Sequence, residues 1–503
     1  MRKRQTAAHS LTHTLLACLL ALCGAVVFSP LAQGEAPPLP PGLDSSAAGA
    51  SEADSGAPPL PEGLGEASPS GAPSLPPGLE SEAPPLPPGL GEGEDKVAKE
   101  EQPGVGLRDR FPLELHGFWE VRAGVRTQDD AAQPADATLG ETRLQLETEK
   151  AWQNAVLEFT GDAYLDAVLE DAGFDLRQLR LTWTPFDALD IRLGRQVLTW
   201  GTGDMLFIND LFPKDWQSFF IGRDQEYLKA PGDAVKVGWF NDWVNVEVVY
   251  TPQFDRDRHI TGERISYYDP LSGRSAGQHR ALDTNPPSTW FEDDELAVRL
   301  YRNIGSAELA FYGYSGYWKS PGGMRFIPIQ ATFPKLRVYG ASLRGMLGKG
   351  VGNIELGYYD SYQDRDGDNF LVNNSEFRLL LGYERELAKE FTGAFQYYLE
   401  HMMDYDAYRR TLPFIMETRD ENRHVFTVRL TKLLMNQNLI LSLFTYYSPS
   451  DADAYLRPKA TYKVNDRWTV EAGGNVFLGA SAKTFFGQFE DNTNLYASAR
   501  LSF

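Results

Sequence analysis

The fold of this chain is decided by residues 494–503, which read NLYASARLSF. Leucine, alanine and phenylalanine stand at every second position, and mostly polar side chains stand between them. A period of two is typical of a β-strand with one apolar and one polar face. We expect this strand, which ends on Phe503, to pair with the first strand of a membrane barrel, because lipid tolerates no unpaired strand edge.

In its terminal Phe503 and its alternating apolar residues, the segment resembles the C-terminal signal strand of Gram-negative outer-membrane β-barrels. Leu501 departs from the resemblance, since that family more often has Tyr at this place. The resemblance implies that Phe503 is an assembly signal, that the barrel-assembly machinery is a partner and that outer-membrane lipid surrounds the protein. An edge strand of a soluble β-domain is the alternative interpretation of the same residues.

The net charge and the hydropathy exclude several other classes of protein. The 503 residues carry a formal charge of −21, which argues against nucleic acid as a partner because phosphate binding needs a basic surface. After the first thirty residues, no apolar run approaches the ~20 residues that a membrane helix needs. The mean hydropathy of −0.37 is compatible with a barrel, because alternating strands average to a polar score.

The N-terminus has the three parts of a secretory signal peptide, which we assign to residues 1–34. A basic start at 2–4 precedes an apolar core at 15–28, and the AQG sequence at 32–34 offers a cleavage site between small residues. The signal peptide predicts export from the cytoplasm.

Both cysteines of the chain, Cys18 and Cys23, lie inside this signal peptide. The residues before Cys18 also resemble a lipid-attachment motif, but the apolar run continues well past this cysteine. Removal of the signal peptide would leave a mature chain without a disulfide, a thiolate metal site or a Cys-attached haem.

Residues 35–110 form a linker in which one proline-rich octet recurs. The copies begin at residues 36, 57, 72 and 83 and read APPLPPGL, APPLPEGL, APSLPPGL and APPLPPGL. Residues 35–95 contain acidic side chains and neither Lys nor Arg. Such a composition cannot bury enough apolar surface to fold, and its prolines favour polyproline II. We expect a disordered spacer in the periplasm; docking of the prolines on a periplasmic or cell-wall partner is the alternative.

Residues 111–503 alternate apolar and polar side chains, and their connections alternate between tight turns and mostly longer loops. We place the turns at 150–153, 187–189, 241–242, 303–305, 348–351, 388–389, 435–437 and 465–466. We place the loops at 127–138, 166–175, 201–232, 252–293, 319–333, 364–374, 404–420, 449–451 and 480–492. The sequence therefore predicts an all-β fold, a transmembrane antiparallel up-and-down β-barrel of about 18 strands, with the turns in the periplasm and the loops outside.

A motif at 194–201 adds a second resemblance. The GRQ sequence at 194–196 is followed after three residues by Trp200 and Gly201, and then by a loop with aspartates and prolines. This pattern resembles a family of poorly characterised proteobacterial outer-membrane porin-like barrels, which are distantly similar to the alginate-export barrels. The resemblance covers about forty residues, from the segment that leads into this motif through the loop after it, as well as the general architecture, and it implies a channel.

Loop 201–232 is the candidate constriction of the lumen. It carries several apolar residues that would form an unusual exposed patch, so we expect them to fold inward against the barrel wall. They are Leu206, Phe207, Leu211, Phe212, Trp216, Phe219 and Phe220. A small apolar core over the mouth of the barrel is the alternative.

We expect three aspartates of this loop to stand near the narrowest point and to face arginines of the wall. Opposed charges across a narrow water path create a transverse field that selects dipolar solutes. The predicted pore and constriction residues are Arg192, Arg195, Trp200, Asp204, Asp210 and Asp215.

Arg195 does not fit a strict period of two. That period puts Arg195 on the same face as Ile191 and Leu193, which is the lipid face. An arginine at mid-membrane depth costs ~2–4 kcal/mol. We therefore expect either a bulge near Gly194 that turns Arg195 inward or a different register.

Asp364, Asp366 and Asp368 are a weak candidate for a calcium site, because their spacing resembles a calcium-binding loop. The EF-hand order needs Gly at the sixth position and Glu at the twelfth. Here Asn369 and Ser375 occupy those positions, so an acidic outer loop is the alternative.

No sequence pattern points to catalysis, since the chain has neither an HExxH nor a GxSxG motif. We expect neither an enzyme nor a cofactor. The linker offers no globular plug, which argues against a TonB-dependent transporter. We predict a passive outer-membrane channel for small hydrophilic solutes. The alternatives are a channel for hydrophobic compounds or polymer export, and a structural anchor for the proline-rich tether.

Deletion of residues 35–102 should leave barrel assembly intact, because this acidic, proline-rich stretch has no periodic apolar face with which to join the barrel. Folded barrels of this kind migrate differently on gels before and after heating. The deletion variant should show the heat-modifiable band at the wild-type level. Its loss would contradict the assignment of the stretch as a spacer.

Overall fold

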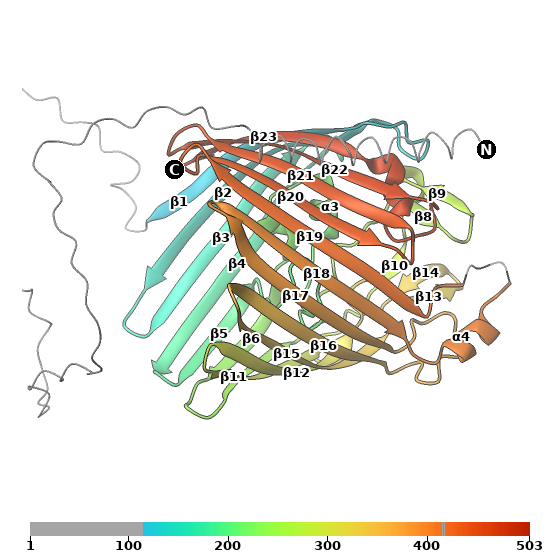
Figure 1. Ribbon diagram of the computed structural model, residues 1–503, viewed down its shortest axis with the longest axis horizontal. Helices are drawn as coiled ribbons and strands as arrows, with labels where there is room; N and C mark the ends of the chain where they lie inside the picture. Colours follow the sequence, from blue (N-terminus) through green and yellow to red (C-terminus); the bar gives the residue numbers. More distant parts are fainter. Residues whose placement is uncertain (1–113, 415, 417) are drawn as a thin grey trace, which may run out of the picture. The chain divides into compact units, whose positions relative to one another are not determined.

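The computed structural model describes residues 114–503 except 415 and 417, so the predicted signal peptide and the whole of the predicted linker lie outside this range. The described chain closes into one antiparallel barrel of 18 strands (Figure 1). The wall strands are β1 (Leu115–Arg126), β2 (Ala137–Ala151), β3 (Ala155–Asp166), β4 (Asp171–Phe186), β5 (Leu189–Gln196), β6 (Gly232–Trp239), β7 (Asn245–Thr251), β11 (Glu295–Ile304), β12 (Ala307–Tyr317), β15 (Lys335–Leu347), β16 (Gly350–Ser361), β17 (Glu376–Ala388), β18 (Phe391–Met402), β19 (Asn422–Leu434), β20 (Leu439–Ser448), β21 (Asp453–Lys463), β22 (Trp468–Gly479) and β23 (Asn494–Ser502).

The barrel closes where the last strand meets the first. β23 pairs with β1 from Phe118 opposite Ser502 to Arg126 opposite Asn494. Beyond the strand, the Phe503 N–H donates to the Gly117 carbonyl (3.0 Å), and the Gly117 N–H donates to the Phe503 carbonyl (3.1 Å). The predicted fold class and strand number are thus confirmed.

The two ends of the barrel differ in their connections, as the sequence predicts. At one end, tight turns join β2 to β3, β4 to β5 and the later pairs in the same way. The other end carries the longer loops, which contain β8 (Tyr267–Asp269), β9 (Arg274–Ala276), β10 (Thr284–Asn285), β13 (Gly323–Phe326), β14 (Ile329–Thr332), α4 (Tyr405–Thr411) and the 3₁₀ turns η2 (Gln278–Arg280) and η3 (Gly487–Asn492). In Figure 1 these loops lie at the right of the barrel.

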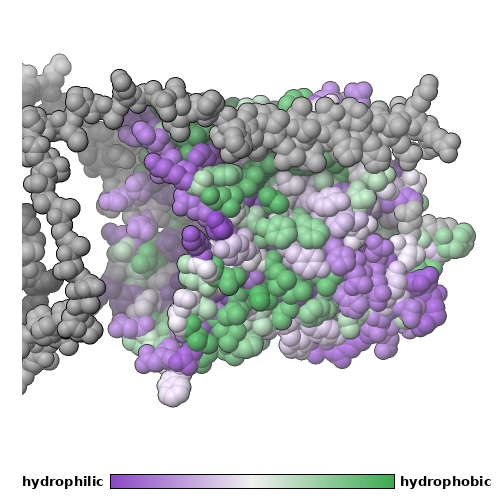
Figure 2. Space-filling model, viewed as in Figure 1, coloured by the Kyte–Doolittle hydropathy of each residue, from purple (hydrophilic) through white to green (hydrophobic). Residues whose placement is uncertain are grey.

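Side chains alternate between the two faces of the wall. In β23, Leu495 is 55% exposed and the neighbouring Tyr496 is 5% exposed. Figure 2 shows hydrophobic surface over the middle of the visible wall and hydrophilic surface towards both ends. This outer band of apolar side chains is what a barrel needs in order to contact lipid.

No helix in the described part of the chain is long and apolar enough to span a membrane.

Replacement of Phe503 by alanine should lower the amount of folded barrel in the membrane severalfold. The substitution removes the aromatic ring at the seam between β1 and β23, where the ring lies beside Gly117. Ser502→Ala is the matched control, because it shortens the adjacent side chain of the same strand. The measurement is the folded fraction in the membrane, and equal levels of the two variants would contradict the role of the ring.

Candidate functional site

Residues 197–231, here called the β5–β6 segment, connect two neighbouring wall strands and contain α3 (Trp216–Ile221) and the 3₁₀ turn η1 (Gln225–Leu228). α3 begins after Asp215, whose carboxylate accepts a hydrogen bond from the Ser218 N–H (2.7 Å). It ends at Gly222, whose φ of 89° suits a glycine. The segment is therefore an ordered structure with its own capped helix.

A buried carboxylate on β16 anchors the first part of this segment. Glu355 is 1% exposed. Its Oε2 accepts hydrogen bonds from the Thr202 N–H (2.8 Å), the Thr202 hydroxyl (3.0 Å) and the Gly203 N–H (3.1 Å). Its Oε1 accepts from the Asn209 N–H (2.7 Å) and the Asn209 side-chain amide (3.0 Å). These neutral donors satisfy the charge in place of water.

Two wall glycines allow the segment to approach this closely. Gly340 on β15 and Gly357 on β16 are register partners. A Cβ at Gly340 would lie 1.7 Å from Asn209 Oδ1, and a Cβ at Gly357 would lie 2.5 Å from Ile208 Cγ2. Any other residue at these places would collide with the segment, so both glycines serve close packing.

The segment also contacts the wall at β18, β19 and β20. Asp204 forms an ion pair with Arg429 of β19, in which the Nη2–Oδ1 distance is 2.7 Å. The Asp204 N–H donates to Gln396 Oε1 of β18 (2.8 Å), and the Gln396 amide donates back to the Asp204 carbonyl (2.8 Å). The Tyr446 hydroxyl of β20 donates to the Met205 carbonyl (2.6 Å). Polar wall side chains therefore bind the backbone of the segment as well as the carboxylate of Asp204.

The aromatic side chains of α3 are packed rather than exposed. Phe219 and Phe220 are 2% and 3% exposed. The ring of Phe220 lies 5.3 Å from that of Tyr455 on β21 and 5.4 Å from that of Phe477 on β22, both nearly perpendicular to it. Phe219 and Phe220 therefore belong to an aromatic core between α3 and the wall, while four other apolar residues of the predicted set are only partly buried against it: Leu206, Phe207, Leu211 and Trp216.

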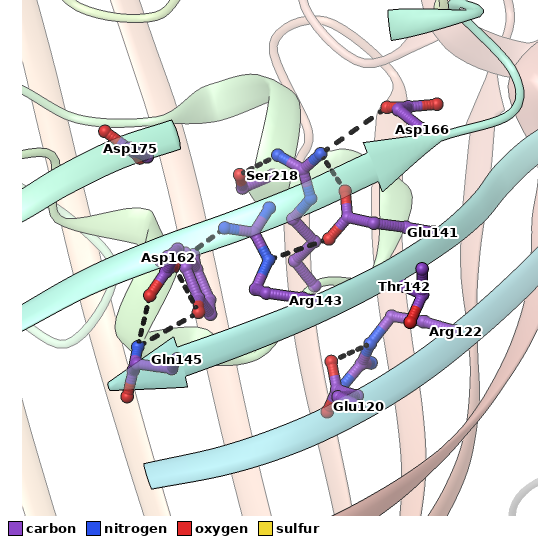
Figure 3. A network of polar contacts seen from close by, with 12 residues as sticks. Glu120, Arg122, Glu141, Thr142, Arg143, Gln145, Asp162, Asp166, Asp175 and Ser218 are labelled. Carbon is purple, nitrogen blue, oxygen red and sulfur yellow. Dashed lines mark hydrogen bonds and ion pairs between the residues drawn. The ribbon is translucent and has the colours of Figure 1, made fainter. Parts of the chain in front are cut away.

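A polar network covers the opposite part of the wall, on β1, β2 and β3 (Figure 3). Arg122 is 2% exposed; its Nη1 donates to the Gly222 carbonyl (2.6 Å) and to Glu471 (2.9 Å). Arg143 pairs with Glu141 (2.9 Å) and with Asp162 (2.7 Å). Burying charges is costly unless each is paired, and this network pairs each one.

The second half of the segment is attached to this network. The Tyr227 hydroxyl donates to Asp162 (2.8 Å), and Arg223 forms an ion pair with Glu141. Arg500 of β23 approaches Asp224 (3.3 Å). The strands whose side chains form hydrogen bonds or ion pairs with the β5–β6 segment are β1, β2, β3, β4, β7, β16, β18, β19, β20, β21 and β23.

The three predicted aspartates have different partners from those expected. Asp204 faces Arg429, and neither Arg192 nor Arg195. Asp210 is 5% exposed and binds Lys214 of its own segment (3.0 Å). Asp215 caps α3 and is 2% exposed. The expectation that all three face wall arginines is wrong, because two of them satisfy the segment's own donors.

The two predicted wall arginines also pair locally. Arg192 forms an ion pair with Asp190 of its own strand (3.0 Å). Arg195 pairs with Asp233 of β6 (2.9 Å), its register partner, without any register shift at this place. A cross-strand ion pair of this kind needs no partner from the loop.

Arg195 lies on the outward face, so the expected bulge or altered register is wrong. Its register partner on β4 is Leu179, which is 45% exposed, and Leu193 on the same face is 39% exposed. Gly194 has a φ of 110°, but the pairing continues regularly through it. The arginine is tolerated because it stands near the loop end of β5, where a lipid-facing charge costs only about 0–1 kcal/mol.

Trp200 is 9% exposed, and its indole N–H donates to Glu247 of β7 (3.0 Å). Its ring lies 5.0 Å from that of Phe212, nearly perpendicular to it. Trp200 therefore fastens the start of the segment to the wall and does not line an open path.

The weak calcium candidate has a structural explanation. Asp364 is 5% exposed and accepts hydrogen bonds from the backbone N–H groups of Asp368 (3.1 Å) and Asn369 (3.2 Å). Burial raises the pKa of this carboxyl. Among the described residues, no group of three or more His, Cys, Asp or Glu side chains is arranged to hold a metal. The Asp364 side chain therefore stabilises the turn of its own loop by accepting hydrogen bonds from the loop backbone.

Glu355 is the residue of this site that sequence reasoning missed. The alternation on β16 places Glu355 on the inward face, but no pattern marks it as the partner of residues some 150 positions earlier. Gln396 was missed for the same reason. Only the register of the closed barrel brings these side chains opposite the segment.

Replacement of Glu355 by glutamine should loosen the segment. An amide group in place of one oxygen leaves buried N–H donors without an acceptor, which costs about 1–3 kcal/mol. We expect a lower unfolding temperature and faster proteolysis within residues 201–232. Glu158→Gln is the matched control, because the polar partners of Glu158 in the described part of the chain are the wall residues Gln178 and Arg180. Equal stability and equal digestion of both variants would contradict the anchoring role.

No protein-family model and no curated protein matches this sequence. Among solved structures, OccD3 (OpdP) of Pseudomonas aeruginosa is similar at 8% identity and a TM-score of 0.46, over 77% of this chain and 91% of that one. OccAB3 of Acinetobacter baumannii is similar at 9% identity and 0.45, over 78% and 99%. A triple mutant of a Rhodopseudomonas blastica porin is similar at 10% identity and 0.34, over 78% and 100%.

Proposed function

We propose that this barrel is a porin-like channel of the outer membrane, through which small hydrophilic solutes diffuse passively, and that residues 201–232 narrow its lumen. A barrel of 18 strands encloses an aqueous lumen unless something fills it. The observation that carries the proposal is the ring of contacts between the β5–β6 segment and inward-facing side chains of strands around the wall.

Polar groups that remain partly exposed support a water path beside the segment. In the ion pair of Asp204 and Arg429, the two side chains are 36% and 25% exposed. Asp224 and Arg500 are 31% and 20% exposed. Each pair joins an acid of the segment to a base of the wall, so a solute that passes the pair meets a local dipole of two opposite charges. Such a field favours dipolar over apolar solutes.

The packing of the aromatic residues argues against a route for hydrophobic compounds. The rings of Phe219 and Phe220 are buried against one another and against the wall, and the ring of Trp216 packs partly buried beside them. A hydrophobic route needs apolar surface that a ligand can reach. The anchor hypothesis differs from the channel hypothesis in one respect that can be measured, since a sealed barrel passes no current.

The assignments of the N-terminal regions follow from the proposed orientation, in which the short turns of the barrel face the periplasm. We propose that residues 1–34 are removed on export and that residues 35–110 stay on the periplasmic side, because β1 begins at the short-turn end of the barrel. The barrel-assembly machinery would then insert residues 111–503 into the outer membrane.

Replacement of residues 205–228 by a short Gly-Ser linker should raise the single-channel conductance in planar bilayers severalfold, because it removes the structure that we propose as the constriction. The control keeps the full segment and shortens the β13–β14 hairpin of an outer loop. A shortened variant that folds and conducts like the wild type would place the constriction elsewhere.

Asp204→Asn should shift the ion selectivity towards anions, because it leaves Arg429 as an uncompensated cation beside the path. Asp210→Asn is the matched control, since Asp210 is buried and paired with Lys214. Reversal potentials in a salt gradient measure the effect. An equal shift in both variants would contradict the placement of Asp204 at the path.

A further inference from the structure

A group of cations stands on the outward face of the barrel at the loop end of β15 and β16. Lys335 and Arg337 are alternate residues of β15, and the residues between and after them, Leu336 and Val338, are 2% and 0% exposed. Since buried side chains on this strand face inward, Lys335 and Arg337 face outward. Arg365 follows β16 and shares the Tyr362 ring with Arg337. We call Lys335, Arg337, Tyr362 and Arg365 the outer-rim cation patch.

From the patch towards the turn end of the barrel, the outward side chains of β15 and β16 change character in a regular order. Leu343 and Ile354 are apolar register partners, each 44% exposed. Nearer the loop end, Tyr339 and Tyr358 are partners and are 55% and 40% exposed. This order of aliphatic, then tyrosine, then cation matches the passage from the apolar layer through the interface to the headgroups. The patch therefore stands at headgroup depth.

Two guanidinium groups share one aromatic ring in the patch. The Cζ atom of Arg337 lies 4.4 Å from the centre of the Tyr362 ring, and that of Arg365 lies 4.7 Å from it. Arg365 also binds Asp360 with two hydrogen bonds, of 3.1 and 2.8 Å. The ring thus holds both cations at the wall, and of the two it is the guanidinium group of Arg337 that has donors left to bind outward, since Arg365 is bound to Asp360.

The positive charges of the patch exceed the carboxylates that neutralise them. Asp360 pairs with Arg365. Among the residues that the structure describes, no carboxylate lies within 4 Å of the cationic nitrogens of Lys335 or Arg337, although the chain as a whole carries a charge of −21. Asp366 and Asp368 occur in the same loop as Arg365, but neither forms an ion pair with the patch. Two uncompensated cations remain at the wall.

We propose that the outer-rim cation patch binds the phosphate group of an anionic lipid in the membrane leaflet on the loop side. The wall at this place faces lipid, so the molecules beside it are lipid headgroups. A guanidinium fork matches the geometry of phosphate oxygens, and Lys335 adds a third cation at the edge. The exposed tyrosines below the patch would contact the glycerol and upper acyl region of the same lipid.

The test uses the full mature chain in zwitterionic detergent and native mass spectrometry, with dioleoyl phosphatidic acid as the phosphate-bearing probe and dioleoyl phosphatidylcholine as the zwitterionic one. Wild-type protein should retain phosphatidic acid in preference to phosphatidylcholine. The double variant Arg337→Gln, Arg365→Gln should retain about tenfold less phosphatidic acid. The matched control, Arg256→Gln with Arg325→Gln, removes two cations from outer loops and should bind like the wild type.

Three results would overturn the proposal. The first is equal retention of phosphatidic acid by the patch variant and the wild type. The second is displacement of the lipid by inorganic phosphate at the same concentration, which would make the patch a general anion site. The third is a dimer of the wild type that the patch variant loses with no change in lipid retention, which would make the patch a contact between copies. The heat-modifiable band serves to verify that every variant folds.

Discussion

The structure depends on one constraint: inside a bilayer, a backbone N–H or C=O group has no water to bind. A sheet can meet this constraint only if its last strand pairs with its first. Here β23 meets β1 along its whole length, and the pairing continues to Phe503 and Gly117. Closure then creates an interior and an exterior, and the environment of each wall side chain depends on which of the two it faces.

The interior is organised by a buried charge that is neutralised without a cation. Glu355 accepts hydrogen bonds from backbone and side-chain donors of the β5–β6 segment, and the facing glycines give the segment room to reach it. Hydrogen bonds from N–H groups to a carboxylate are directional, so they fix the position of the segment as well as attaching it to the wall. The aromatic core of α3 and the network of Arg122 and Arg143 then hold the remaining part from other directions.

Charge pairing explains why the predicted constriction differs from the observed arrangement. A buried or lipid-facing charge takes the nearest partner that its backbone position allows. Arg195 therefore pairs with Asp233 across one strand and stays outside, and Arg192 pairs with Asp190 on its own strand. Asp210 and Asp215 serve the segment itself. Of the three aspartates, Asp204 alone reaches a wall arginine, and that residue is Arg429.

The sequence by itself determined the barrel, the number of its strands and the ends at which turns and loops lie, because alternation and turn residues are local properties that each strand carries independently. It also marked the β5–β6 segment, since a loop with so many apolar residues needs burial. Only the tertiary structure decided which residues hold that segment. Glu355, Gln396 and Arg429 lie on strands far along the chain from their partners, and their contacts depend on the register summed around the closed barrel. A shift of one residue in a single strand would turn them to the other face, so no local pattern can specify these contacts.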